Sequence, residues 1–297
     1  MSDVDLDALA SYEFALPAEQ IAQRPLEERS AARLLVVPTS GGLQHRHVRD
    51  LVELVRPGDV LVVNDTTVIP ARLYGEKAGT GGRVEVLLVR PWRSNADSGA
   101  SSIGATWVCL VNASKKPKPG TRLVFGTGTA HSIDGFFATV DGALDDEPGA
   151  FLVRFEGDPV RFAQSYGHVP LPPYIARDDD AGDVARYQTV FHDANKPGSS
   201  AAPTAGLHFD DALLDALRAK GAQLAKVTLH VGPGTFLPVR GAKVSEHARH
   251  PEPWFVDERA SITIQHAKRN GGRVIAVGTT SLRCLESAAD DDGNVAP

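Results

Sequence analysis

Short runs of consecutive apolar residues mark where the chain is expected to form buried strands. One run, residues 60–63 (V-L-V-V), is followed directly by the polar residues N-D-T-T. A second, residues 273–277 (R-V-I-A-V), precedes G-T-T-S, and a third, residues 33–37 (R-L-L-V-V), ends at a proline. Runs of this length between turn signals are typical of strands inside a sheet. Residues 223–231 predict a further strand, which ends in a histidine.

Between these runs, apolar residues recur with the spacing of helices that bury one face. Asp210 and Asp257 each precede such a stretch, where an aspartate side chain accepts hydrogen bonds from the first backbone N–H groups of a helix. The alternation of strands and helices predicts an α/β fold. The predicted helices cover residues 48–55, 160–166, 210–219, 257–270 and 282–289, with a shorter one beginning at residue 18.

The pattern changes between residues 70 and 155. Short segments rich in β-forming residues follow one another there, separated by glycine-rich turns and without helical spacing, which predicts a small barrel or sandwich. Because the strand–helix pattern resumes afterwards, we interpret this region as an all-β domain (70–155) inserted into a large, layered α/β domain (1–69 and 156–297). The predicted strands are 72–74, 83–90, 106–111, 121–125, 132–140 and 151–155.

Residues 197–209 (P-G-S-S-A-A-P-T-A-G-L-H-F) contain almost no bulky side chain. Proline restricts φ and glycine permits close approach of another group, so this segment predicts a rigid loop with small walls. A flat ligand would fit against such a loop, with Thr204 and His208 as its polar groups. Two other segments are predicted to be non-helical: the proline-rich extended stretch 167–175 and the acidic loop 178–183.

Polar loops follow the carboxyl ends of several predicted strands, at residues 64–67 (N-D-T-T), 229–236 (L-H-V-G-P-G-T-F) and 278–281 (G-T-T-S). Ligands of open α/β sheets bind outside the carboxyl ends of the strands, so we expect a binding site there. Thr279 and Thr280 admit two interpretations. Either hydroxyl caps the following helix, or the free N–H groups and hydroxyls together hold an anion.

Composition limits the class of protein. The chain has 297 residues, 42% hydrophobic and 23% charged, as in ordinary globular proteins. A net charge of −6 argues against a general nucleic-acid coat protein but leaves room for a local basic patch. Cys109 and Cys284 form no C-x-x-C pair, which excludes a thiolate zinc site. No signal peptide and no membrane-length apolar run is visible, so we expect a cytoplasmic protein.

Residues 246–252 (E-H-A-R-H-P-E) concentrate histidines and carboxylates. Two histidines three apart and a carboxylate are able to bind zinc. However, Pro251 and Pro253 argue against a continuous helix, and the pattern is not H-E-x-x-H. We therefore favour acid–base or substrate-binding roles for these histidines over a metal site.

Residues 114–122 (S-K-K-P-K-P-G-T-R) place three lysines in a stiff loop of the β domain. Such a loop suits contact with a phosphate backbone, and equally suits a solvated hairpin. The sequence alone favours the hairpin.

Several longer motifs resemble one family, the S-adenosylmethionine:tRNA ribosyltransferase-isomerases of queuosine biosynthesis, over nearly the whole chain and in the same order. The motifs are N-D-T-x-V-I-P-A-R-L (64–73), G-H-V-P-L-P-P-Y-I (167–175), A-P-T-A-G-L-H-F (202–209), T-L-H-V-G-P-G-T-F-x-P-V (228–239), E-H-x-x-H-x-E (246–252) and V-G-T-T-S (277–281).

The resemblance implies a monomeric cytoplasmic enzyme with an α/β domain and an inserted β-barrel. It implies transfer and isomerisation of the ribosyl part of S-adenosylmethionine onto 7-aminomethyl-7-deazaguanine at the wobble position of tRNA. The products are epoxyqueuosine-tRNA, adenine and methionine. S-adenosylmethionine is then a co-substrate, and no cofactor or metal is implied.

The implied chemistry needs a base that removes a hydrogen beside the sulfonium, for which neutral histidine is suited. The candidate catalytic residues are His208, His230, His247 and His250, with Glu252 as orienting group or alternative base. The candidate substrate-binding residues are Asn64, Asp65, Arg72, Thr204, Gly206, Gly234, Thr235, Thr279 and Thr280. The resemblance also favours Lys115, Lys116 and Lys118 as tRNA contacts.

Two features depart from the family pattern. Thr67 stands where the family has arginine, and family members continue past the last motif with further strands and a T-N-F-H-L-P type motif. We therefore expect this chain to be truncated at its C-terminus. Two alternatives to the enzyme stay open: a non-catalytic tRNA- or nucleoside-binding relative, and a metal-dependent hydrolase that uses residues 246–252.

Overall fold

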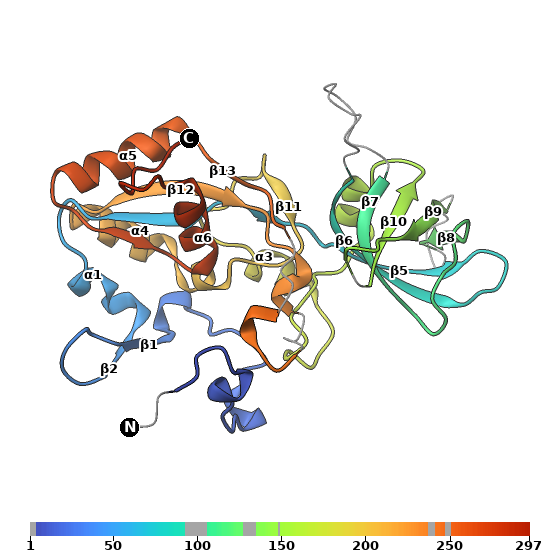
Figure 1. Cartoon of the computed structure of the whole chain (residues 1–297), viewed down its shortest axis with the longest axis horizontal. Helices are drawn as coiled ribbons and strands as arrows, with labels where there is room; N and C mark the ends of the chain where they lie inside the picture. The colour runs from blue at the N-terminus through green and yellow to red at the C-terminus, as the bar shows by residue number, and fades with distance from the viewer. Residues whose placement is uncertain (1–3, 93–105, 127–134, 148, 237–240, 247–250) are drawn as a thin grey trace.

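A computed structural model describes the chain except residues 1–3, 93–105, 127–134, 148, 237–240 and 247–250. Figure 1 shows two parts side by side, a layered α/β part and a β-barrel. The predicted fold class, an α/β fold with an inserted all-β barrel, is confirmed. The barrel strands run from residue 72 to residue 155. The division of the chain at residues 69/70 and 155/156 stays a prediction.

The layered part is built on a mixed sheet. Its order is β13 (Trp254–Val256), β12 (Gln223–Leu229), β3 (Val60–Asn64), β14 (Val274–Ala276). Strands β12 and β14 run parallel to β3, while β13 runs antiparallel to β12. The carboxyl ends of β3, β12 and β14 therefore meet at one edge of the sheet.

Helices cover both faces of this sheet, and strand β3 shows why its sequence is apolar throughout. Side chains alternate between the faces of a strand. Val60 and Val62 pack toward α5 (Glu258–Arg269) and α6 (Thr279–Ala288), whereas Leu61 and Val63 pack toward α1 (Leu51–Leu54) and α4 (Asp211–Ala219). Figure 1 shows α5 and α4 on opposite sides of the sheet. A strand covered on both faces has no position for a solvated polar residue.

The barrel closes antiparallel in the order β10-β7-β6-β5-β8-β9. Its interior holds large apolar side chains, among them Phe125 and Phe155. Helix α2 (Pro159–Tyr166) packs against it, with the ring of Phe162 stacked 4.3 Å from that of Phe136. The strands are β5 (Arg72–Lys77), β6 (Arg83–Pro91), β7 (Thr106–Ala113), β8 (Arg122–Phe125), β9 (Phe136–Ala143) and β10 (Ala150–Phe155).

Shorter elements account for the rest of the regular structure among the described residues. Strand β4 pairs in parallel with β11, and β1 pairs with β2 in a hairpin. The remaining elements are β1 (Arg33–Val36), β2 (Gln44–His47), β4 (Thr67–Val68), α3 (Ala181–Arg186), β11 (Pro197–Ser199) and the 3₁₀ helices η1 (Leu9–Tyr12), η2 (Ala18–Gln20), η3 (Arg29–Ala31), η4 (Val48–Asp50), η5 (Thr204–His208), η6 (Pro233–Phe236) and η7 (Val244–Glu246). No helix among the described residues is long and apolar enough to cross a membrane.

Two predicted buried strands are less buried than expected. Strand β1 pairs within the described chain with β2 alone, so its residues alternate between exposed and half-buried. Strand β14 lies at the edge of the described sheet and is half-buried. Apolar runs identify strands but do not tell how many neighbours each strand has.

Three predicted loops contain regular structure. The prediction of an acidic loop over residues 178–183 is wrong for residues 181–183, because helix α3 begins at Ala181. Asp180 and Asp183 form a capping box there, each side chain accepting from the other residue's backbone N–H. The segment 197–209 contains strand β11 and the 3₁₀ helix η5, and residues 233–236 form η6.

Candidate functional site

The carboxyl edge of the sheet gathers segments that are far apart in sequence. Residues 64–67 leave β3, residues 230–232 leave β12, and residues 277–278 leave β14. The segment after β11 lies along this edge, because the backbone N–H of Ser200 donates to the Val231 carbonyl at 3.0 Å.

Asn64 and Asp65, predicted to bind substrate, lie inside the protein, each 1% exposed. The Asn64 amide donates to the Leu229 carbonyl at 2.9 Å and accepts from the Leu229 N–H at 3.0 Å. One oxygen of Asp65 pairs with Lys196 Nζ at 2.7 Å, and the other accepts from the Thr228 hydroxyl at 2.7 Å. Both side chains therefore tie β3 to neighbouring segments.

His230 lies directly after β12, and its ring is held from several sides. Its Nδ1 lies 3.0 Å from the hydroxyl of Thr66, which lies 2.7 Å from the hydroxyl of Ser199. The Ser199 hydroxyl oxygen accepts from the Val231 N–H at 2.8 Å. We call Thr66 and Ser199 the hydroxyl pair.

Glycine at position 198 makes room for the imidazole of His230. A Cβ atom there would stand 2.7 Å from His230 Nδ1, closer than real contacts allow. The rings of Phe255 and His230 pack edge to face, with 6.3 Å between their centroids. Burial lowers the pKa of His230 below its ordinary value; the Asp65 carboxylate opposes this effect and the Lys196 ammonium adds to it. His230 is therefore neutral at neutral pH.

Glu252 joins the loop after β12 to helix α6. Its Oε1 accepts from the Gly232 N–H at 2.8 Å, and its Oε2 pairs with Arg283 Nη1 at 2.5 Å. The Glu252 side chain is only 12% exposed. Glu252 thus has a donor on each oxygen, which matches its predicted role as an orienting group better than that of a base.

The amino end of α6 is capped neither by Thr279 nor by Thr280. The N-cap residue is Gly278, with φ at +87°; having no side chain, it does not cap the helix with a side-chain hydrogen bond. The interpretation of Thr279 or Thr280 as the N-cap is therefore wrong. The hydroxyls of Thr280 and Ser281 are buried and have no partner among the described residues. A Cβ at residue 278 would lie 3.0 Å from that of Ala205, so η5 abuts this end.

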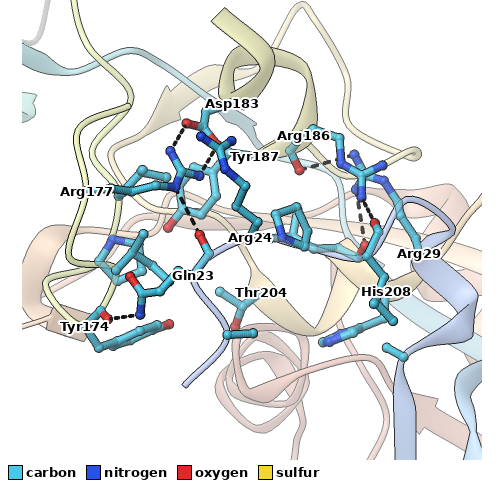
Figure 2. A pocket seen from close by; sticks show the side chains of 18 of the residues that line it. Gln23, Arg24, Arg29, Tyr174, Arg177, Asp183, Arg186, Tyr187, Thr204 and His208 are labelled. Atoms are coloured by element: carbon cyan, nitrogen blue, oxygen red, sulfur yellow. Dashed lines mark hydrogen bonds and ion pairs between the residues drawn. The ribbon is translucent and has the colours of Figure 1, made fainter. Parts of the chain in front are cut away.

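A cavity of about 520 Å³ opens beside η5 (Figure 2). Three stretches form its walls: the N-terminal segment 22–33, residues 171–187 with α3, and η5. Most of the wall is apolar. Burial raises the pKa of Tyr187 to about 12, so this phenol stays neutral. The side chains that line the cavity include Pro25, Leu26, Leu171, Pro172, Tyr174, Ile175, Tyr187, Thr204, Leu207 and His208.

Arginines hold the cavity walls together, as Figure 2 shows. The Arg29 guanidinium donates to backbone carbonyls on two walls, at 2.8 to 3.2 Å. Arg177 makes a two-pronged contact with Asp183, at 2.7 and 2.8 Å. The cavity is therefore braced before any ligand enters it. The carbonyls that accept from Arg29 are those of Ala185, Arg186, Gln188 and Leu207.

Thr204 and His208 lie at the two ends of η5, and both are exposed at the cavity. His208 Nδ1 lies 3.2 Å from the Ala205 carbonyl oxygen. A carbonyl only accepts hydrogen bonds, so Nδ1 carries the hydrogen and, in the neutral ring, Nε2 carries the free electron pair.

The other predicted residues are dispersed. Arg72 belongs to β5 and pairs with Glu85 at 3.0 Å. Gly206 is buried against Phe191, which explains the glycine by packing. Gly234 and Thr235 lie in η6, and His247 and His250 lie outside the described residues. The exposed residues Lys115, Lys116 and Lys118 lie between β7 and β8.

Within the described part of the chain, no group of three or more histidine, cysteine, aspartate or glutamate residues is placed to hold a metal ion. The histidines of the proposed zinc cluster, residues 247 and 250, are not in that part.

Sequence reasoning assigned no role to Thr66, Ser199, Arg29 or Arg283. Small polar residues beside a predicted strand end were the only available signal for the hydroxyl pair. Nothing local indicated Arg29 or Arg283, because their partners lie far along the chain or in another element.

Comparison with known proteins gives consistent results. The sequence profile of a family described as "Queuosine biosynthesis protein" matches residues 9–296. A protein of Syntrophotalea carbinolica named S-adenosylmethionine:tRNA ribosyltransferase-isomerase is 47% identical over 290 residues, 97% of this chain and 79% of that protein. One of the same name from Azoarcus sp. is 49% identical over 285 residues, 95% of this chain and 75% of that protein.

Among solved structures, the S-adenosylmethionine tRNA ribosyltransferase of Thermotoga maritima is 29% identical to this chain. The similarity covers 94% of this chain and 73% of that one, with a TM-score of 0.41.

Proposed function

Because this chain belongs to the queuosine biosynthesis protein family, we propose that it is an S-adenosylmethionine:tRNA ribosyltransferase-isomerase. The observation that carries this proposal is the extent of the match: it spans residues 9–296 and therefore includes both the layered part and the barrel. Its substrates are S-adenosylmethionine and tRNA.

In finer detail, the enzyme transfers the ribosyl group to 7-aminomethyl-7-deazaguanine at the wobble position. The sulfonium acidifies the adjacent ribose C5′ hydrogens. A base removes one of them, and the resulting carbanion attacks the deazaguanine. Adenine and methionine then leave, and epoxyqueuosine-tRNA remains. The protein must supply a base, a pocket for the nucleoside, and a surface for the tRNA.

The cavity beside η5 suits the nucleoside. Its volume, about 520 Å³, is within the usual range for small-molecule sites, and its walls combine apolar side chains with a few polar groups. Tyr174 and Tyr187 provide flat aromatic surface, and Thr204 provides a hydroxyl for the ribose.

His208 is the base that this geometry favours. Its Nδ1–H is engaged by the Ala205 carbonyl, which leaves Nε2 free to take a proton, and the side chain is at the cavity. Glu252 and Arg283 organise the neighbouring edge of the sheet.

The β7–β8 loop suits the tRNA backbone, since Lys115, Lys116 and Lys118 are all exposed and lie within four residues of one another. We further propose that the enzyme acts as a monomer in the cytoplasm, where tRNA is found and where its two buried free cysteines stay reduced.

The test is incubation of the purified chain with S-adenosylmethionine and tRNA that carries 7-aminomethyl-7-deazaguanine, with adenine measured by chromatography. Adenine release supports the proposal, and His208→Ala is expected to abolish it while the far-UV circular dichroism spectrum stays unchanged. Unmodified tRNA is the control.

Two other results would replace the proposal. Binding of both substrates without adenine release indicates a non-catalytic relative. Stoichiometric zinc in the purified protein, with hydrolytic activity, indicates the metal-dependent alternative.

A further inference from the structure

The direction of the hydrogen bonds around His230 follows from counting hydrogens. The Ser199 hydroxyl oxygen accepts from the Val231 N–H, and its remaining partner among the described residues is the Thr66 hydroxyl. Thr66 in turn has Ser199 on one side and His230 Nδ1 on the other. Thr66 and Ser199 are each 0% exposed, so water does not provide further partners at their surface.

One direction gives every hydrogen an acceptor. Ser199 donates to Thr66, and Thr66 donates to His230 Nδ1. In the opposite direction, Thr66 donates to Ser199, and the Ser199 hydrogen then has no acceptor among the described residues. A buried donor without a partner costs about 1–3 kcal/mol, so the first direction is favoured.

The first direction determines the tautomer of His230. Its Nδ1 accepts, so the hydrogen of the neutral ring is on Nε2. No hydrogen bond engages Nε2 within the described residues, and it is not among the buried atoms that lack a partner. The Nε2–H group therefore reaches accessible space at the carboxyl edge of the sheet.

We propose that His230 acts in the reaction as a hydrogen-bond donor through Nε2–H, not as the base, and that Thr66 and Ser199 are the positioning residues that determine this tautomer. This inference rests on the proposed function. His230 is not among the described residues that line the cavity beside η5, so the acceptor is an oxygen or ring nitrogen of the part of the substrates that reaches the carboxyl edge of the sheet. Neutral histidine is an effective donor of this kind because it needs no reorganisation during the reaction.

The lowered pKa of His230 agrees with this role. A protonated ring would carry hydrogen on Nδ1, which would reverse both hydroxyls and leave Ser199 without an acceptor. Burial lowers the pKa of His230, the Asp65 carboxylate opposes this effect, and the Lys196 ammonium adds to it. His208 has the opposite tautomer, with Nδ1–H and a free Nε2. The two histidines therefore have opposite tautomers in the neutral state, His208 with a free acceptor and His230 with a free donor.

The first test reads the tautomers directly and needs no activity. The wild-type chain is labelled with ¹⁵N-histidine, and two-bond ¹H–¹⁵N correlation spectra are recorded where the rings are neutral. His230 and His208 signals are assigned by their loss in His230→Gln and His208→Gln. We expect hydrogen on Nε2 of His230 and on Nδ1 of His208. Hydrogen on Nδ1 of His230 overturns the proposal.

The second test compares variants in the adenine-release assay. The glutamine amide keeps a donor but is no base, so His230→Gln should retain kcat within about tenfold, while His230→Ala loses about a hundredfold or more. His208→Gln should lose as much as His208→Ala. Equal losses in His230→Gln and His230→Ala, with His208→Gln active, reverse the roles and overturn the proposal.

The hydroxyl pair is tested by its own substitutions. Thr66→Val removes the donor to Nδ1 and should lower kcat about tenfold with little change in KM, whereas Thr66→Ser should restore it. A Thr66→Val enzyme with unchanged kcat and pH profile contradicts the positioning role. If the wild type releases no adenine, the proposed function fails, but the tautomer spectra still decide the direction of these hydrogen bonds.

Discussion

Arg283 of helix α6 holds the carboxylate of Glu252 at 2.5 Å, and the opposite oxygen of Glu252 accepts from the Gly232 N–H. Through this contact, the loop after β12, the approach to β13 and the helix after β14 are joined at the carboxyl edge of the sheet. Glu252 therefore orients backbone at the candidate site, and its role can be separated from that of a base.

Substitution Glu252→Gln should lower adenine release about tenfold or more and unfolding free energy by about 1–2 kcal/mol. The amide keeps one acceptor for Gly232 but turns an N–H group toward Arg283, and hydrogen bonds to charged groups are worth about 1.5–3 kcal/mol before solvent exposure of Arg283 is considered. Chemical denaturation and the adenine assay measure both effects. The matched control is Glu286→Gln, on the exposed side of α6; equal effects in the two variants would contradict the orienting role.

The pair Asp59–Arg273 should make stability depend on acid pH. Asp59 is 1% exposed, and the hydrogen bond from Arg273 lowers its pKa to about 2. A carboxyl group with a lowered pKa stabilises the fold above its unfolded pKa of about 4, and this contribution is lost as pH falls toward about 2. At neutral pH, Asp59→Asn should cost about 2 kcal/mol.

Urea denaturation at several pH values measures this difference, which should shrink steadily between about pH 4 and about pH 2. The control Asp215→Asn alters an exposed carboxylate that pairs with Arg218 on α4 and should change stability by under about 0.5 kcal/mol. A loss in Asp59→Asn that does not vary with pH would mean that the charge of Asp59 is not its cause.

Substitution of Gly206 tests whether this glycine is needed for packing or for substrate binding. A Cβ there would lie 2.6 Å from Phe191 Cζ and 2.8 Å from Thr189 Cγ2. Gly206→Ala should therefore destabilise the fold by about 1–3 kcal/mol and disturb η5. Gly142→Ala, where a Cβ would meet nothing within 4 Å, is the matched control. If Gly206→Ala keeps full stability and loses only S-adenosylmethionine affinity by calorimetry, Gly206 is a substrate contact instead.

If the lysines of the β7–β8 loop contact tRNA, the tRNA-binding constant should depend on salt concentration through them. Each lysine that neutralises a phosphate contributes about 1 to the slope of log K against log salt. Lys116→Ala should weaken tRNA binding and reduce this slope by about 1, measured by filter binding at several salt concentrations. Lys220→Ala, at another exposed lysine directly after α4, removes the same charge at a different place. Equal effects would indicate a general charge effect and not a contact.

Local signals predicted much of the architecture. The apolar run at β3 and the aspartates before α4 and α5 act within a few residues, and the side chains of Asp210 and Asp257 accept from nearby backbone N–H groups as expected. The neighbours of each strand were harder to predict from sequence. Strands β1 and β14 have the apolar sequences of buried strands, but β1 lies in a two-stranded hairpin and β14 at the edge of the described sheet.

The sequence by itself determined most element types, the all-β insertion and the polar loops at the carboxyl edge of the sheet, since periodicity and capping are properties of adjacent residues. It did not indicate helix α3 or the cavity wall formed by residues 22–33. The tertiary structure alone decided what those residues do. The side chains of Asn64 and Asp65 are buried and form hydrogen bonds to neighbouring segments. The partner of His230 Nδ1 is the hydroxyl of Thr66, 164 residues away in sequence, which in turn contacts the hydroxyl of Ser199. The position of a single hydrogen on an imidazole depends on such contacts, and folding, not sequence spacing, brings them together.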